Sequence, residues 1–206
     1  MIKRLNFLNF IVVLCLAVLI TSENKAFSLE QSYSELYYMG IAGSYSEADL
    51  DNNFNPKASE GINFRSGTTY TNWFSAELNI DYFLKFKGDS LTYDNQTVNP
   101  DLEHEVISFT MDAKVMPYIG LKNIRPFVLV GAGWMISKAR VRNNAKDYLN
   151  SLNMDGSDYC VDIRYGIDYR LSNTYSFDAT GGYIMGYGDV KDINIRFYSI
   201  GISYHF

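Results

Sequence analysis

Large apolar residues occupy every second position along many stretches of this chain. The clearest example is the last stretch, where apolar residues alternate with serine, glycine and histidine. Successive side chains of a β-strand point to opposite faces, so this pattern predicts a strand with one continuous apolar face. When a strand with such a face belongs to a closed barrel, the apolar face can contact membrane lipid. The residues on this face are Tyr198, Ile200, Ile202, Tyr204 and Phe206.

The same period of two recurs in seven earlier segments, which predicts an all-β fold. Long polar loops alternate with short turns between the segments, as is typical of an eight-stranded antiparallel up-and-down transmembrane β-barrel with long extracellular loops and short periplasmic turns. The long loops are expected at 47–60, 87–102 and 141–157, and the short turns at 70–72, 120–123 and 172–174. The strands are expected at 35–46, 61–69, 73–86, 103–118, 125–140, 158–171 and 175–187, with the closing strand after residue 192.

A soluble eight-stranded barrel of the lipocalin type is the competing fold, with its apolar residues facing inward around a ligand. Periodicity alone does not say which face is inside. In 158–171, however, one face carries aromatic and branched residues, while the other carries opposite charges and glycine. Small and mutually pairing groups fit a narrow lumen, whereas the apolar face is unsuited to water. The pattern therefore favours the membrane barrel.

The N-terminal segment and the composition agree with this interpretation. Lys3 and Arg4 precede an apolar run at 10–20, and a small-x-small site ends at Ser28. This predicts a signal peptide over 1–28, removed from a mature barrel domain at 29–206. The apolar run is shorter than the ~20 residues of a spanning helix. The 17 Tyr and 13 Phe fit interfacial girdles, and the net charge of −5 argues against nucleic acid as a partner.

Nine charged residues have the parity that faces the lumen of the predicted barrel. Because an isolated buried charge is costly, we expect them to pair with one another and to plug the barrel. A narrow channel remains the alternative if the pairs can rearrange. The residues of this predicted network are Glu77, Asp81, Asp112, Lys114, Asp162, Arg164, Asp168, Arg170 and Asp178.

Four cations have the opposite, outward parity, close to the extracellular edge of the lipid-facing band. Arginine and lysine are suited to phosphate contact, so these residues are candidates for contact with the phosphates of lipopolysaccharide. The alternative is that these four cations are ordinary solvent-exposed residues where strands meet the loops, which explains their positions equally well. The four are Lys138, Arg140, Arg142 and Arg196.

Support for catalysis is weak. Neither His104 nor His205 has a serine or cysteine at a spacing that suggests an activated nucleophile. The acidic residues around His104 are interpreted as a solvated rim rather than a cation site. We therefore predict no catalytic residues, no metal and no cofactor.

The chain resembles the small outer-membrane β-barrel family that includes opacity-type surface proteins and the OmpA barrel domain. The resemblance rests on the signal peptide and on the segments 73–78, 126–133 and 201–206. It implies the outer membrane of a Gram-negative bacterium as the location. It also implies that Tyr198, Ile200, Ile202, Tyr204 and Phe206 form a signal read by the barrel-assembly machinery.

These observations together predict a non-enzymatic structural or surface-exposed protein, similar to a surface antigen or adhesin. Its expected partners are outer-membrane lipid and lipopolysaccharide, the barrel-assembly machinery and host surface molecules. The alternative is a narrow porin-like channel for small solutes. A membrane-embedded lipid enzyme is a third interpretation, for which no residue signature is found.

Overall fold

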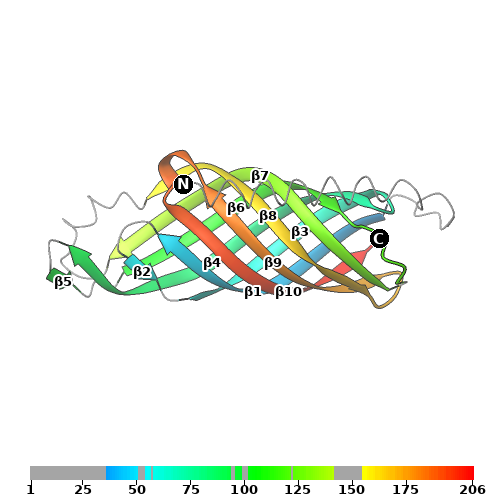
Figure 1. Cartoon of the computed structure of the whole chain (residues 1–206), viewed down its shortest axis with the longest axis horizontal. Helices are drawn as coiled ribbons and strands as arrows, with labels where there is room; N and C mark the ends of the chain where they lie inside the picture. The colour runs from blue at the N-terminus through cyan, green and yellow to red at the C-terminus, as the bar shows by residue number, and fades with distance from the viewer. Residues whose placement is uncertain are drawn as a thin grey trace.

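One antiparallel sheet closes on itself into a barrel (Figure 1). The computed structural model describes residues 36–50, 54–56, 58–93, 96–98, 102–121, 123–141 and 155–206. Each barrel strand pairs with the next along the chain, β4 pairs with β6, and β10 pairs with β1 to complete the ring. The eight barrel strands are β1 (Leu36–Leu50), β3 (Ser59–Thr71), β4 (Phe74–Tyr93), β6 (Leu102–Val115), β7 (Ile124–Val141), β8 (Gly156–Arg170), β9 (Tyr175–Gly186) and β10 (Ile193–His205).

The predicted eight-stranded up-and-down barrel is confirmed, and its two ends differ. The short connections at 72–73 and 171–174, and the described residues 116–121 and 123, lie at one end, which we call the turn end. The C-terminus lies there too, at the right of Figure 1. The opposite, loop end carries the short strands β2 (Phe54–Pro56) and β5 (Gln96–Val98), which both pair with β4, and the 3₁₀ turn η1 (Gly188–Val190). In the described part of the chain, no helix has the length and hydrophobicity needed to cross a bilayer.

Two predicted loops begin too early. Residues 47–50 extend β1, and residues 87–93 extend β4. The reason is backbone pairing: Glu47 lies opposite Arg196 on β10, and Lys87 lies opposite Glu103 on β6. Polar composition suggested loops there, but the strands continue because a neighbouring strand is present to accept and donate their hydrogen bonds. Of the third predicted loop, residues 142–154 lie outside the described part of the chain.

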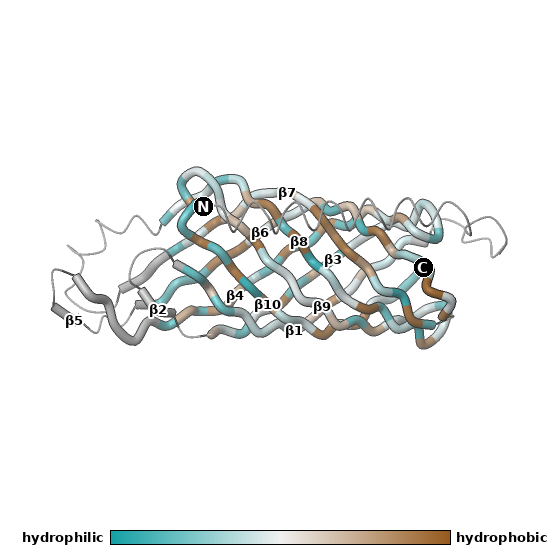
Figure 2. Tube along the Cα trace, in the orientation of Figure 1, coloured by the Kyte–Doolittle hydropathy of each residue, from teal (hydrophilic) through white to brown (hydrophobic). Residues whose placement is uncertain are grey.

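The outer wall of the barrel is apolar, as the alternation predicts. Ile200 on β10 is 73% exposed and Tyr159 on β8 is 65% exposed, and large apolar residues on the other strands follow the same parity. Figure 2 shows hydrophobic and hydrophilic stretches interleaved along the strands. So extensive an apolar surface is unfavourable in water. This arrangement excludes the lipocalin-type alternative, in which the apolar face would line the interior.

The lumen contains two kinds of side chain at two levels. Buried charged and amide groups fill the middle of the lumen and the part near the turn end. Toward the loop end, however, the inward side chains are mainly apolar, whereas the sequence suggested an inward face of charges, glycines and serines throughout. We call this second group the apolar cluster: Ala48, Phe83, Phe86, Val106, Met135, Cys160, Ile184, Val190, Ile193, Ile195 and Phe197.

Candidate functional site

A single guanidinium organises the middle of the lumen. Arg164 on β8 donates from Nε to Oδ2 of Asp162 at 2.6 Å and from Nη2 to Oδ2 of Asp81 at 2.6 Å. Asn63 on β3 donates to Oδ1 of the same Asp81 at 2.9 Å. All four side chains are buried. These residues, which we call the central network, join β3, β4 and β8 across the lumen.

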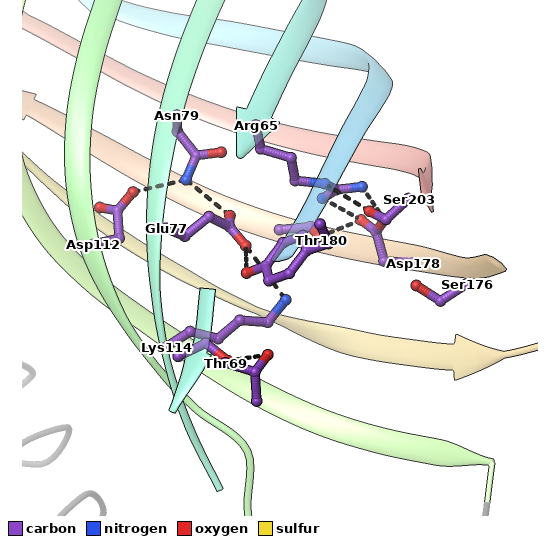
Figure 3. Close-up of polar contacts among 12 residues, drawn as sticks. Arg65, Thr69, Glu77, Asn79, Asp112, Lys114, Ser176, Asp178, Thr180 and Ser203 are labelled. Atoms are coloured by element: carbon purple, nitrogen blue, oxygen red, sulfur yellow. Dashed lines mark hydrogen bonds and ion pairs between the residues drawn. The ribbon is translucent and has the colours of Figure 1, made fainter. Parts of the chain in front are cut away.

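A second group lies nearer the turn end and is centred on Glu77 of β4 (Figure 3). Tyr38 on β1 donates its hydroxyl to Oε2 at 2.6 Å, and Asn79 donates to Oε1 at 2.9 Å. The ammonium of Lys114 on β6 lies 3.4 Å from Oε2. Strong donors thus surround this carboxylate on both oxygens, which offsets the cost of burying it.

Arg65 on β3 completes the turn-side network, by which we mean Tyr38, Arg65, Glu77, Asn79, Lys114 and Asp178. Its guanidinium binds both oxygens of Asp178 on β9, with an Nη1–Oδ2 distance of 2.8 Å. Its Nε donates to Ser203 on β10 at 3.2 Å. The ion pair therefore joins β3 to β9, and the hydrogen bond to Ser203 joins β3 to β10, both across the β1–β10 closure.

Asp112 differs from the other buried acids. Asn79 and Thr110 donate to its Oδ2 at 2.7 and 3.0 Å, but none of the salt bridges formed among the described residues includes it. It lies opposite Gly131 on β7, which in turn lies opposite Asp162 on β8. The missing side chain of Gly131 provides the space for Asp112, because a Cβ there would overlap the carboxylate.

Seven of the nine charged residues expected in the lumen are buried there, but they do not all pair with one another, since Asp178 pairs with Arg65 and Asp112 forms no salt bridge among the described residues. Asp168 and Arg170 lie at the turn end and are only half-buried, unlike the other seven residues. Sequence reasoning also omitted Tyr38, Asn63, Arg65 and Asn79. Their inward parity was readable from the alternation, so the omission came from counting only some of the polar residues on that face.

The apolar cluster covers the loop side of the central network. The ring of Phe197 on β10 lies under the Arg164 guanidinium, with 5.0 Å between Arg164 Cζ and the ring centroid. The same ring contacts Phe83 at a centroid distance of 5.9 Å. Phe86 adds a further ring, 6.4 Å from Phe83. It reaches the lumen because the β4–β6 register shifts between Phe83 and Phe86, which reverses the parity expected from strict alternation.

Both histidines contact a serine on a neighbouring strand, which sequence spacing did not reveal. Nε2 of His104 lies 2.5 Å from Oγ of Ser137, and Nε2 of His205 lies 2.9 Å from Oγ of Ser176. His104 and Ser137 are fully enclosed beside Phe86. The described residues contain no group of three or more potential metal ligands.

Two of the four outward candidates have side chains within the described part of the chain. Lys138 on β7 and Arg196 on β10 are exposed on the outer face near the loop end. Each lies opposite an acid on the adjacent strand, Glu105 and Glu47 respectively. Arg142 and the side chain of Arg140 lie outside the described residues. The residues of the predicted assembly signal all project outward on β10 or just after it: Tyr198, Ile200, Ile202, Tyr204 and Phe206.

Comparison with known families and structures gives a consistent result. The family model for the outer membrane protein β-barrel domain matches residues 11–206. Comparison with curated proteins gives no match. Among solved structures, Neisserial surface protein A is 14% identical, with a TM-score of 0.60 over 82% of this chain and 97% of that one.

Two further solved structures share the fold. OprG from Pseudomonas aeruginosa is 12% identical, with a TM-score of 0.57 over 84% of this chain and 95% of that one. Ail, the attachment invasion locus protein of Yersinia pestis, is 15% identical, with a TM-score of 0.55 over 84% of this chain and 99% of that one. That crystal structure contains the heparin analogue sucrose octasulfate. At these identities the likeness establishes the fold alone.

Proposed function

Because this chain belongs to the outer membrane protein β-barrel family, we propose that it is a non-enzymatic barrel with a closed lumen that acts through its outer wall and its extracellular end. The family places the chain in the bacterial outer membrane. Such barrels have short periplasmic turns and longer extracellular loops, so the turn end faces the periplasm. The loop end then faces the outside of the cell.

The observation that carries this proposal is the filling of the lumen at two levels. A permeating solute would have to displace the ion pairs of Arg164 and then pass the rings of Phe83 and Phe197. An eight-stranded barrel has an interior that side chains just fill. The narrow porin-like channel requires both barriers to open together, which makes the closed barrel the better-supported function.

Planar-bilayer recording tests the closed lumen directly. We expect the refolded protein to insert without producing conductance steps. Steady and reproducible steps, of the same size in independent preparations, would contradict the proposal and support the porin-like channel. A barrel of established conductance serves as the positive control for insertion.

We propose lipopolysaccharide as one partner of the outer wall. Lys138 and Arg196 are exposed close to the extracellular edge, where they would meet lipid phosphates. Replacing both with glutamate should weaken lipopolysaccharide association in a reconstituted assay while the barrel still folds. Equal binding by the double variant and the unmodified protein would assign both cations to their acidic neighbours, Glu105 and Glu47.

Contact with a host surface molecule is the second proposed role of the extracellular end. The support is the shared fold with Ail, whose structure holds a heparin analogue. Shortening the connection at 142–154 should reduce binding to host cells or immobilised heparin. Undiminished binding would contradict the host-contact role and support a structural role only. The same connection should be dispensable for refolding, because among the described residues β7 already pairs with β8 from Ile124 opposite Tyr169 to Ser137 opposite Gly156.

A non-enzymatic role agrees with the enclosure of the His104–Ser137 contact near the loop end. A nucleophile must reach its substrate, and Ser137 is buried among lumen side chains. Two further assignments stay proposals. Residues 1–28 should be absent from the mature protein, as N-terminal sequencing would reveal, and the outward face of β10 should be read by the barrel-assembly machinery.

A further inference from the structure

A small cavity lies at the periplasmic turn end of the lumen, beyond the turn-side network. Six of its lining side chains are charged: Arg65, Lys114, Arg125, Arg170, Asp168 and Asp178. The free space suits about one water-sized particle, which excludes sugars, nucleotides and other organic ligands. Any occupant must therefore be water or a small ion.

Lys114 is an incompletely paired cation that lines this cavity. Its side chain is 7% exposed, and its ammonium can donate three hydrogen bonds. Among the described residues it makes one long contact, 3.4 Å to Oε2 of Glu77, whose oxygens already accept shorter bonds from Tyr38 and Asn79. Two rings occupy other sides of the ammonium, Phe127 at 4.4 Å and Tyr38 at 5.4 Å from their centroids. A buried ammonium with such incomplete pairing is costly unless another acceptor is near.

The charges around the cavity favour a negative occupant. Four cations line it against two carboxylates, and Glu77, bound to Lys114, brings the acids to three. The local surplus is therefore a single positive charge. The carboxylates of Asp81, Asp112 and Asp162 do not line the cavity, and Arg164 pairs with two of them.

We propose that this cavity binds one monovalent anion of the size of chloride, held by Lys114 together with the guanidinium groups of Arg125 and Arg170. The anion supplies the acceptor that Lys114 lacks and neutralises the local surplus. It also adds a third closure at the periplasmic end of the lumen. This inference is independent of the proposed lack of conductance, which is measured separately in planar bilayers.

The test compares unfolding of the refolded protein in chloride and in gluconate, an organic anion too large for the cavity, at equal ionic strength. We expect chloride to raise the urea midpoint in a saturable manner. In Arg125→Gln, which keeps the contact between Lys114 and Glu77, the half-saturating chloride concentration should increase about tenfold, as expected for the loss of one charge-assisted interaction. Lys191→Met, at an exposed lysine after η1, should retain the response of the unmodified protein.

Crystals grown in bromide provide a second measurement that does not depend on variant stability. An anomalous peak within hydrogen-bonding reach of the Lys114 ammonium would support the site. A chloride-independent midpoint, or the absence of a bromide peak there, would assign the cavity to water and overturn the proposal. An equal loss of response in Arg125→Gln and Lys191→Met would place the anion effect on the outer surface and overturn it as well.

Discussion

Replacement of Arg164 by methionine tests how much the barrel depends on its central network. The guanidinium makes close contacts with two buried acids: 2.6 Å to Asp81 Oδ2, and 2.6 and 2.5 Å to Asp162 Oδ2. Methionine fills similar space but leaves both carboxylates without their cation. Breaking a buried pair in this way typically costs about 3–5 kcal/mol. Because two acids lose one shared partner, we expect a loss of about 4 kcal/mol or more in the free energy of unfolding.

Urea unfolding in lipid vesicles measures this loss, with the fluorescence of Trp73 and Trp134 as the reporter. Trp134 is exposed on the outer wall and Trp73 in the turn before β4, and both indoles should change their surroundings when the barrel unfolds. Arg196→Met is the matched control, since Arg196 is exposed on β10 and should cost less than about 1 kcal/mol.

A triple variant separates the charge argument from simple loss of packing. Adding Asp81→Asn and Asp162→Asn to Arg164→Met removes the uncompensated charges and should recover more than half of the lost stability, because neutral replacement of a complete buried ion group is often well tolerated. The reasoning is refuted if Arg164→Met unfolds within about 1 kcal/mol of the unmodified protein. A triple variant no more stable than the single variant would instead attribute the loss to packing against Phe197.

Three further predictions use matched positions in the same barrel. Gly133→Ala should destabilise the fold by about 2 kcal/mol or more in the same urea assay, because its Cβ would overlap the backbone carbonyl of Phe109. The control is Gly43→Ala, whose Cβ meets nothing within 4 Å and which should be neutral or stabilising by up to about 1 kcal/mol. Equal effects of the two substitutions would contradict the close approach of β6 and β7. Tyr38→Phe should cost about 1–3 kcal/mol by removing a donor to buried Glu77, with the exposed Tyr45→Phe on the same strand as a near-neutral control. Phe206→Ala should refold in detergent like the unmodified protein but reach the outer membrane of cells in smaller amounts; equal amounts on cell fractionation would argue against the assembly signal.

The period-two pattern predicted the number, order and orientation of the strands because these depend on one local rule. Each strand separates lipid from lumen, so its alternation is visible without knowledge of its neighbours. Strand ends were harder to predict. Residues 47–50 and 87–93 look like loops by composition. They are strands because 47–50 pair with β10, while 87–93 pair first with β6 and then with β2 and β5. Strand extension is thus a tertiary effect that single-segment patterns do not contain.

The lumen was predicted only in part, for a related reason. Parity identified the charged residues that face inward, but it did not reveal which residues pair. Arg65 reaches Asp178 across a sequence separation of 113 residues, through the closure of β3, β1, β10 and β9. Phe86 escaped prediction because the register shift after Phe83 turns it inward. Neither the register shift in β4 nor the pairing of β1 with β10 can be read directly from the sequence.

The division of the lumen into a charged level and an apolar level follows from a conflict between two requirements. Ion pairs across the middle of the lumen tie distant strands together, as Arg164 ties β8 to β4, but exposed ion pairs are weakened by water and salt. The apolar cluster closes the loop side of these pairs with Phe83 and Phe197 and so keeps water away from them. The electrostatic contacts are then strong because the rings exclude solvent, and the rings are held in place because the strands that carry them are tied together. Each level depends on the other, so opening this lumen for transport would weaken the barrel itself.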